Sequence, residues 1–202
     1  SEQQQQRFAG SLKARLHELE HQVRDMLIFA RGDLPLNDRL SPAALLSALR
    51  SAGEPRLQGA SVRWQCDVQG VEVLCNRDTL VGALLNLIEN ALQASVGAPR
   101  LKVHLYRRDE TVRVCISDCG KGIDAETLGR LGEPFFTTRP NGSGLGLAVV
   151  RKIVDQHGAE IRVDSRPGRG TRFELAWPVA PATRVSRVAR RIWPVQIVGK
   201  RR

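Results

Sequence analysis

The chain has 202 residues, 42% apolar and 26% charged, a composition typical of a soluble protein with one sizeable core. No apolar run approaches the ~18 residues of a membrane span. The N-terminal residues do not form a secretory signal and no cysteine pair is spaced CxxC, so we expect a cytoplasmic protein with reduced thiols. The net charge of +10 does not indicate a nucleic-acid-binding face. Seven basic residues and no acid lie between Arg184 and Arg202, which leaves +3 for the remainder.

The first predicted element is a long helix over residues 8–30. Its apolar side chains form two series spaced by seven residues, typical of the seam of a coiled coil or helix bundle. These series are Leu12, Leu19 and Met26, and Leu16, Val23 and Ala30. We assign residues 1–31 to this helix.

The segment "HELEH" at residues 17–21 has three interpretations. It matches the zinc-protease pattern HExxH, its first histidine could accept a phosphoryl group, or both histidines could be solvated. No third zinc ligand is evident, and the seam register turns His17 and His21 outward. The sequence therefore favours a solvated face.

Residues 32–40 contain Gly32 and Pro35 and are predicted to be a linker. A helix is expected after Ser41, because serine caps helices and Pro42 suits a first turn. Two strands within 61–68 and 71–76 precede a helix over 77–94 with apolar residues at helical spacing.

Alternating residues predict a strand hairpin over 100–108 and 111–118. A glycine-rich stretch leads to a helix ended by Gly158, and a second hairpin covers 159–165 and 171–177. Residues 41–180 are thus expected to form an α+β domain, a two-layer α/β sandwich with a mostly antiparallel sheet. Residues 181–202 are expected to be a solvated basic tail.

Two asparagines on the helix over 77–94 are the first candidate site residues. Asn86 and Asn90 are four residues apart and share one face. Their amide oxygens suit Mg²⁺. Taken alone, this pair could equally satisfy buried backbone groups.

Three glycine-rich motifs follow. Asp118, with Gly120 and Gly122, ends a strand where a carboxylate could accept a hydrogen bond from adenine, although an ordinary turn is the better interpretation of this motif taken alone. A second motif opens a helix, as phosphate-binding loops do, but lacks the preceding strand of a dinucleotide site and the Lys-Ser/Thr pair of a P-loop. It consists of Gly142, Gly144 and Gly146. The third motif, Gly168, Gly170 and Thr171, is typical of a hairpin turn.

In this order the motifs resemble the ATP-binding domain of sensor histidine kinases, within the superfamily of gyrase, Hsp90 and MutL. "NLIENA" is similar to the asparagine box, "DCGKG", "GSGLGLAVV" and "GRGTRF" to the glycine boxes, and "EPFFTTR" to the phenylalanine box. The resemblance covers residues 41–178, is nearest to the nitrogen-regulation type, and implies the Bergerat-type ATP-binding fold. The nucleotide contacts that it implies are Asn86, Asn90, Gln93, Asp118, Gly120, Gly122, Ile123, Arg139, Gly142, Ser143, Gly144, Leu145, Gly146 and Thr171.

The resemblance also implies roles for these residues. Asn90 would bind Mg²⁺, Asp118 would recognise adenine with Thr171 nearby, and Arg139 would contact the terminal phosphates. Asn86 stands where ATP-hydrolysing relatives have a glutamate base, which favours transfer over hydrolysis. Gln93 replaces a lysine of many family members.

Residues 1–31 are similar to the second helix of the dimerisation and phosphotransfer hairpin. The acceptor histidine would lie on a first helix outside this chain, so we expect ATP binding without autophosphorylation. The implied partners are a second copy in the full-length protein and a response regulator that activates alternative-sigma-factor transcription; no nucleic acid is expected. The alternative is an ATP-binding regulatory module, similar to anti-sigma factors, that acts by partner capture. The helix over 8–30 favours the kinase.

Overall fold

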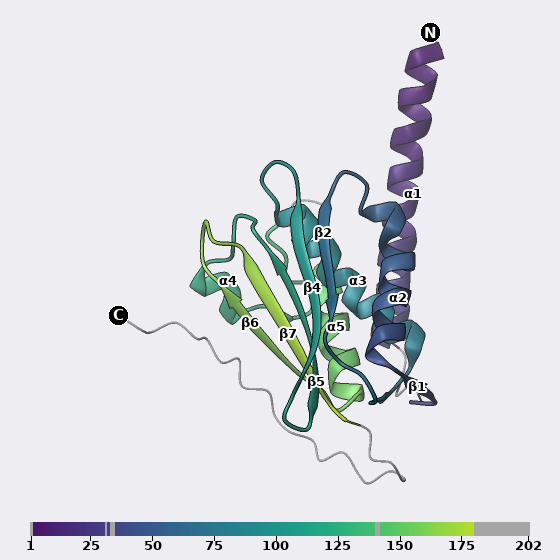
Figure 1. Ribbon diagram of the computed structural model, residues 1–202. Coiled ribbons are helices and arrows are strands. Elements are labelled where there is room, and N and C mark those ends of the chain that lie inside the picture. Colours follow the sequence, from purple (N-terminus) through teal and green to yellow (C-terminus); the bar gives the residue numbers. More distant parts are fainter. Residues whose placement is uncertain (1, 31, 33–34, 140–141, 180–202) are drawn as a thin grey trace.

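A computed structural model of the chain describes residues 2–30, 32, 35–139 and 142–179 (Figure 1). Some side chains of the N-terminal helix also lie outside the described part, His17 and His21 among them. The expectation of a solvated histidine pair therefore stays a prediction, as does that of a solvated tail over 181–202.

The described elements follow the predicted order, with additions. The helices are α1 (Glu2–Ala30), α2 (Pro42–Gly53), α3 (Arg77–Ala94), α4 (Ala125–Gly129) and α5 (Gly146–Gln156), and a 3₁₀ turn spans Glu54–Arg56. The strands are β1 (Asp38–Leu40), β2 (Ser61–Cys66), β3 (Val73–Cys75), β4 (Arg100–Arg108), β5 (Thr111–Asp118), β6 (Glu160–Ser165) and β7 (Thr171–Pro178). The predicted cap of α2 is confirmed, since the Ala44 N–H donates to Ser41 Oγ at 3.2 Å.

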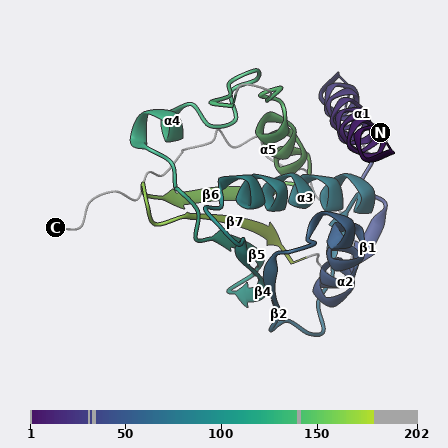
Figure 2. The same ribbon diagram turned by 90° about the horizontal axis from the view of Figure 1, so that it is seen from above.

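One five-stranded sheet has the order β2-β4-β5-β7-β6, in which only β2 and β4 run parallel. Helices α2, α3 and α5 cover one face of it, which confirms the predicted two-layer α+β architecture (Figure 2). The prediction that residues 32–40 are a linker is wrong for the last three residues of this segment. Residues 38–40 form β1, which pairs with β3 in a separate two-stranded sheet.

The core lies between the sheet and these helices. Strand β4 turns alternate residues such as Val103 and Leu105 inward, where they are fully buried. Helix α3 contributes Leu84 and Leu87, and α5 contributes Ile153, all with no exposed surface. Each such side chain stabilises the fold by about 1.5–3 kcal/mol. This packing fixes α3 and α5 side by side on the sheet.

Helix α1 projects beyond the domain and contacts it near its C-terminal end (Figure 1). The predicted seam residues Leu12, Leu16, Leu19, Val23 and Met26 are 54–59% exposed, so the seam is not covered by the described part of the chain. By contrast, Ile28 and Phe29 pack against the core. No described helix is long and apolar enough to cross a membrane.

The C-terminal end of α5 is held by a buried histidine. His157 Nδ1 lies 2.7 Å from the Ile153 carbonyl oxygen, and the Asn76 N–H donates to His157 Nε2 at 3.0 Å. These partners require a neutral ring with its hydrogen on Nδ1. Burial lowers the pKa of His157, and the hydrogen bond to the Ile153 carbonyl opposes the shift. Gly158, at φ +61°, then ends the helix as predicted.

We predict that His157 makes the fold sensitive to acid. Its pKa is lower in the folded than in the unfolded state, so its stabilising contribution is present above about pH 6.5 and is lost as pH falls toward the folded pKa. His157→Leu should lower the free energy of unfolding at pH 7.5 by about 1–3 kcal/mol and should flatten its decline between pH 7.5 and 5. Urea unfolding at both pH values measures this. Equal declines in the native protein and in His157→Leu would contradict the prediction.

Candidate functional site

The predicted site residues come together where α3, the loop after β5, and the start of α5 meet. The Lys121 N–H donates to the Ala94 carbonyl oxygen at 2.9 Å, joining that loop to the end of α3. Asn86 Nδ2 donates to the Gly146 carbonyl oxygen at 3.5 Å, joining α3 to α5. Residues from three separate motifs therefore lie in one connected region.

Asp118 is a buried acid of this region, only 8% exposed. Its Oδ1 accepts the Gly120 N–H at 2.8 Å and the Thr171 N–H at 3.2 Å. Burial raises the pKa of Asp118, while the two N–H groups favour the charged form. Within the described residues, Oδ2 makes no hydrogen bond. Oδ1 thus joins two segments of the chain, and Oδ2 can accept a hydrogen bond from a ligand.

The glycines around Asp118 are required by contacts with backbone. A Cβ at Gly170, at φ +77°, would lie 2.1 Å from the Asp118 carbonyl oxygen. Cβ atoms at Gly120 and Gly122 would lie 2.4 Å from Ala94 O and 1.9 Å from Arg166 O. Neighbouring backbone fills the space at Gly120 and Gly122, so a side chain at either position would clash with it.

The two asparagines of α3 have different surroundings. Asn86 is 6% exposed, and its Nδ2 donates to Gly146 O and, at 3.4 Å, to Asp25 Oδ1. Asn90 is half-buried, and its side chain makes no hydrogen bond to the part of the chain that the structure describes. Asn86 therefore satisfies protein groups, as the alternative interpretation held, whereas the amide oxygen of Asn90 is available for a metal ion.

Asp25 is a site residue that the sequence analysis missed. This α1 carboxylate is 3% exposed, and its Oδ2 lies 3.7 Å from the position of a Cβ on Gly146. Helix α5 starts there without a side-chain cap, because its N-cap residue is Leu145. A negative charge is favoured beside the positive end of a helix. Asp25 therefore marks the first turn of α5 as a position that attracts an anion.

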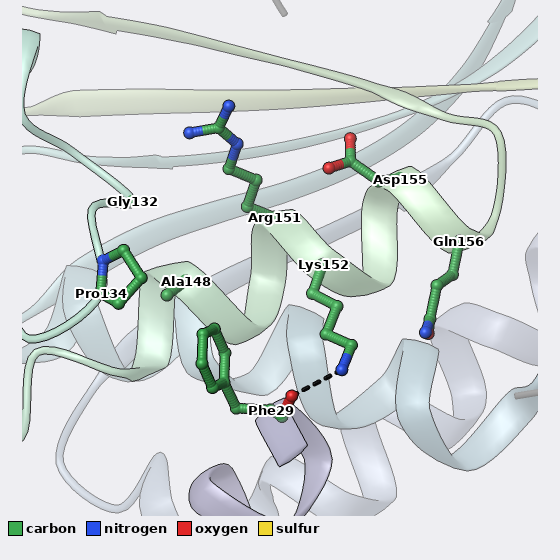
Figure 3. Close-up of a pocket in the computed structure, with 8 residues that line it drawn as sticks. All are labelled: Phe29, Gly132, Pro134, Ala148, Arg151, Lys152, Asp155 and Gln156. Atoms are coloured by element: carbon green, nitrogen blue, oxygen red, sulfur yellow. Dashed lines mark hydrogen bonds between the residues drawn. The ribbon is translucent and has the colours of Figure 1, made fainter. Parts of the chain in front are cut away.

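Helices α1 and α5 are also joined by Lys152, a cationic side chain near the C-terminal end of α5. Lys152 Nζ on α5 donates to the Phe29 carbonyl oxygen near the end of α1 at 2.6 Å (Figure 3). A groove of about 440 Å³ lies beside this contact. Its lining residues are Phe29, Gly132, Pro134, Ala148, Arg151, Lys152, Asp155 and Gln156. The groove thus follows α5 away from the predicted site residues and includes none of them.

Arg139 and Gln93 lie together. The Arg139 guanidinium donates to Gln93 Oε1, and burial lowers the pKa of Arg139. This contact puts a positive charge beside Gln93 at the end of α3.

The remaining predicted residues shape the loops. Gly144, at φ +69°, touches the Phe135 backbone, where a Cβ would lie 2.4 Å from the carbonyl carbon. Ser143 Oγ accepts the Leu145 N–H at 3.2 Å, and Leu145 is buried. Gly142 precedes them, and its N–H donates to the Arg139 carbonyl oxygen at 3.2 Å. The Ile123 N–H donates to Ser165 Oγ at 2.9 Å, a partner that the sequence analysis did not identify.

Comparisons with known proteins agree with this geometry. Residues 75–181 match the family described as histidine kinase-, DNA gyrase B- and HSP90-like ATPase. The sensor protein kinase FleS of Pseudomonas aeruginosa is 60% identical over 92% of this chain, which spans 46% of FleS, about half its length. The sensor histidine kinase ZraS of Escherichia coli K12 is 43% identical over 54% of this chain and 23% of its own length.

Solved structures show the same fold. Full-length ShkA in complex with AMPPNP superposes with a TM-score of 0.75 and 26% identity, over 90% of this chain and 40% of ShkA. The family match covers the residues that carry Asn86, Asn90, Asp118 and Thr171. The chain belongs to the family of histidine kinase-, DNA gyrase B- and HSP90-like ATPases.

Proposed function

We propose that this chain is the ATP-binding catalytic part of a cytoplasmic sensor histidine kinase. It transfers the γ-phosphoryl group of ATP to a histidine on a helix that precedes α1, and from there the group passes to a response regulator that activates alternative-sigma-factor transcription. The observation that carries the proposal is the convergence, in a chain of this family, of the loop after Asp118, helix α3 with Asn86 and Asn90, and the first turn of α5. The sensor kinases FleS and ZraS among its relatives support it.

The residues fit the two ends of ATP. At one end Asp118 Oδ2 would accept a hydrogen from the adenine amino group. At the other, the uncapped N–H groups of α5 would face phosphate oxygens, an arrangement favoured by the helix dipole. Arg139 would add a positive charge near the terminal phosphates.

Mg²⁺ would be held by Asn90. No cluster of three or more metal-ligating side chains occurs among the described residues. Mg²⁺ commonly takes one or two protein ligands together with phosphates and waters, so one amide oxygen fits this ion. When bound, the ion neutralises charge on the phosphates.

Asn86 favours transfer over hydrolysis. Its amide cannot remove a proton from water, and its Nδ2 is engaged by Gly146 O and Asp25. The exposed seam of α1 supports a homodimer in the full-length protein, because apolar heptad positions are covered when helices pair. This seam also favours the kinase over a regulatory module that captures a partner.

We expect Asn90→Ala to weaken ATP binding in the presence of Mg²⁺ and to change it little without the ion, because only the metal ligand is removed. Loss of one charge-assisted contact, about 1.5–3 kcal/mol, corresponds to a ten- to hundredfold rise in Kd. Calorimetry with and without Mg²⁺ measures it. Asn76→Ala, at the cap of α3, is a control that removes an amide elsewhere. An Mg²⁺-dependent affinity equal to the native one in Asn90→Ala would rule out this metal site.

Removing the charge of Asp25 should strengthen ATP binding. Its carboxylate lies beside Asn86 and Gly146, where phosphates would bring like charge. Charge effects at helix ends are about 0.3–2 kcal/mol, so Asp25→Asn should lower the Kd about two- to thirtyfold. Titration calorimetry is again suitable, with Glu160→Gln on β6 as a charge-matched control. An unchanged or higher Kd in Asp25→Asn would contradict the expectation.

Phosphotransfer tests the kinase proposal itself. The chain should bind radiolabelled ATP without labelling itself, whereas a longer version carrying the preceding hairpin helix should become labelled on histidine. The label should be acid-labile and should pass to a response regulator. Substitution of the acceptor histidine by glutamine in the longer protein is the control. ATP binding with no labelling of the longer protein would favour the regulatory module.

A further inference from the structure

The Ser165 hydroxyl, at the end of β6, lies among three polar groups. The Ile123 N–H donates to Ser165 Oγ at 2.9 Å. The Gly170 carbonyl oxygen and Thr171 Oγ1 each lie 2.9 Å from the same atom. Ser165 therefore connects the loop after β5 with the turn that precedes β7.

Counting hydrogens fixes the direction of each bond. A carbonyl oxygen only accepts, so the single hydroxyl hydrogen of Ser165 goes to Gly170 O. The contact with Thr171 then requires Thr171 to donate its hydrogen to Ser165. This is the arrangement in which all three contacts are hydrogen bonds. It leaves Thr171 Oγ1 with lone pairs and no hydrogen for any further partner.

Thr171 is adjacent to Asp118. Its N–H donates to Asp118 Oδ1, and both side chains are buried, at 5% and 8% exposure. Asp118 offers an oxygen of a carboxylate and Thr171 a hydroxyl oxygen whose hydrogen is already used. A base that contacts both side chains would therefore meet only hydrogen-bond acceptors.

We propose that Ser165 is a positioning residue for base specificity: it orients the Thr171 hydroxyl as an acceptor, so that Asp118 and Thr171 select a purine with an amino group at C6 over one with a carbonyl group at C6. Adenine carries an amino group where guanine carries a carbonyl oxygen. The inference rests on the proposed function, because it specifies the base of the nucleotide that the site binds. A buried acceptor facing another acceptor is left unpaired, which costs about 1–3 kcal/mol.

The ratio of the Kd for GTP to the Kd for ATP tests this role, measured by calorimetry with Mg²⁺ on the 202-residue chain. Ser165→Ala frees the Thr171 hydroxyl to rotate and donate to a carbonyl, so the ratio should fall about tenfold, equivalent to about 1.4 kcal/mol. Ser165→Thr keeps a hydroxyl and should retain the native ratio. Ser165→Cys, nearly the same size but a weak hydrogen-bond partner, should lower the ratio and serves if the alanine variant does not fold.

A purely structural role gives a different result. If Ser165 only held the Ile123 N–H, its loss would weaken ATP and GTP alike and leave the ratio unchanged. In a Thr171→Val background there is no hydroxyl to orient, so adding Ser165→Ala should not change the ratio further. If both Ser165→Ala and Ser165→Cys kept the native ratio of the two Kd values, the inference would be overturned and the proposed function would not be affected. Failure of the native chain to bind either nucleotide would instead overturn the proposed function.

Discussion

The pair of hydrogen bonds accepted by Asp118 Oδ1 is the interaction on which the site depends. The two N–H groups belong to the loop after β5 and to the first residue of β7, so one oxygen fixes two segments that are far apart in the sequence. Gly170 then packs directly on the Asp118 backbone, where a Cβ would lie 2.1 Å from its carbonyl oxygen. Asp118 Oδ1 thus stabilises the fold, and Asp118 Oδ2 can accept a hydrogen bond from a ligand.

A second constraint connects this site to α1. Helix α1 contributes a carboxylate beside the start of α5, and α5 contributes Lys152 to a carbonyl near the end of α1 (Figure 3). Both contacts have the sign that helix dipoles favour, anion at an N-terminal end and cation at a C-terminal end. Because Asp25 also touches Asn86, the packing of α1 reaches the residues proposed to contact phosphate. The position of this helix and nucleotide binding are therefore expected to be coupled.

Much of this fold could be predicted from the sequence, because its elements carry strong periodic signals. Helix α3 spans 77–94 as predicted, and the hairpins of β4 with β5 and of β6 with β7 follow from alternating residues and glycine turns. The three-residue strand β1 is too short to show a period and forms through its pairing with β3. Helix α4, of five residues, was missed within a glycine-rich stretch for the same reason.

The candidate site was predictable in its residue types but not in its hydrogen bonds. Spacing predicts that Asn86 and Asn90 share a face, yet the engagement of Asn86 alone depends on where α1 and α5 lie. In the sequence, Asp25 is one of several polar residues on an amphipathic helix. Its burial results from tertiary packing, which the sequence pattern does not show. Ser165 gives no sequence signal, because its role depends on three partners brought together by the turn before β7.

A crystal structure of this chain with Mg²⁺ and a non-hydrolysable ATP analogue would test most directly whether Asp118 serves the fold and the ligand together. The expected result is an adenine amino group within hydrogen-bonding distance of Asp118 Oδ2, while Oδ1 keeps the N–H groups of Gly120 and Thr171. An adenine ring bound away from Asp118, or an Oδ1 that exchanges its backbone partners for the base, would contradict this assignment.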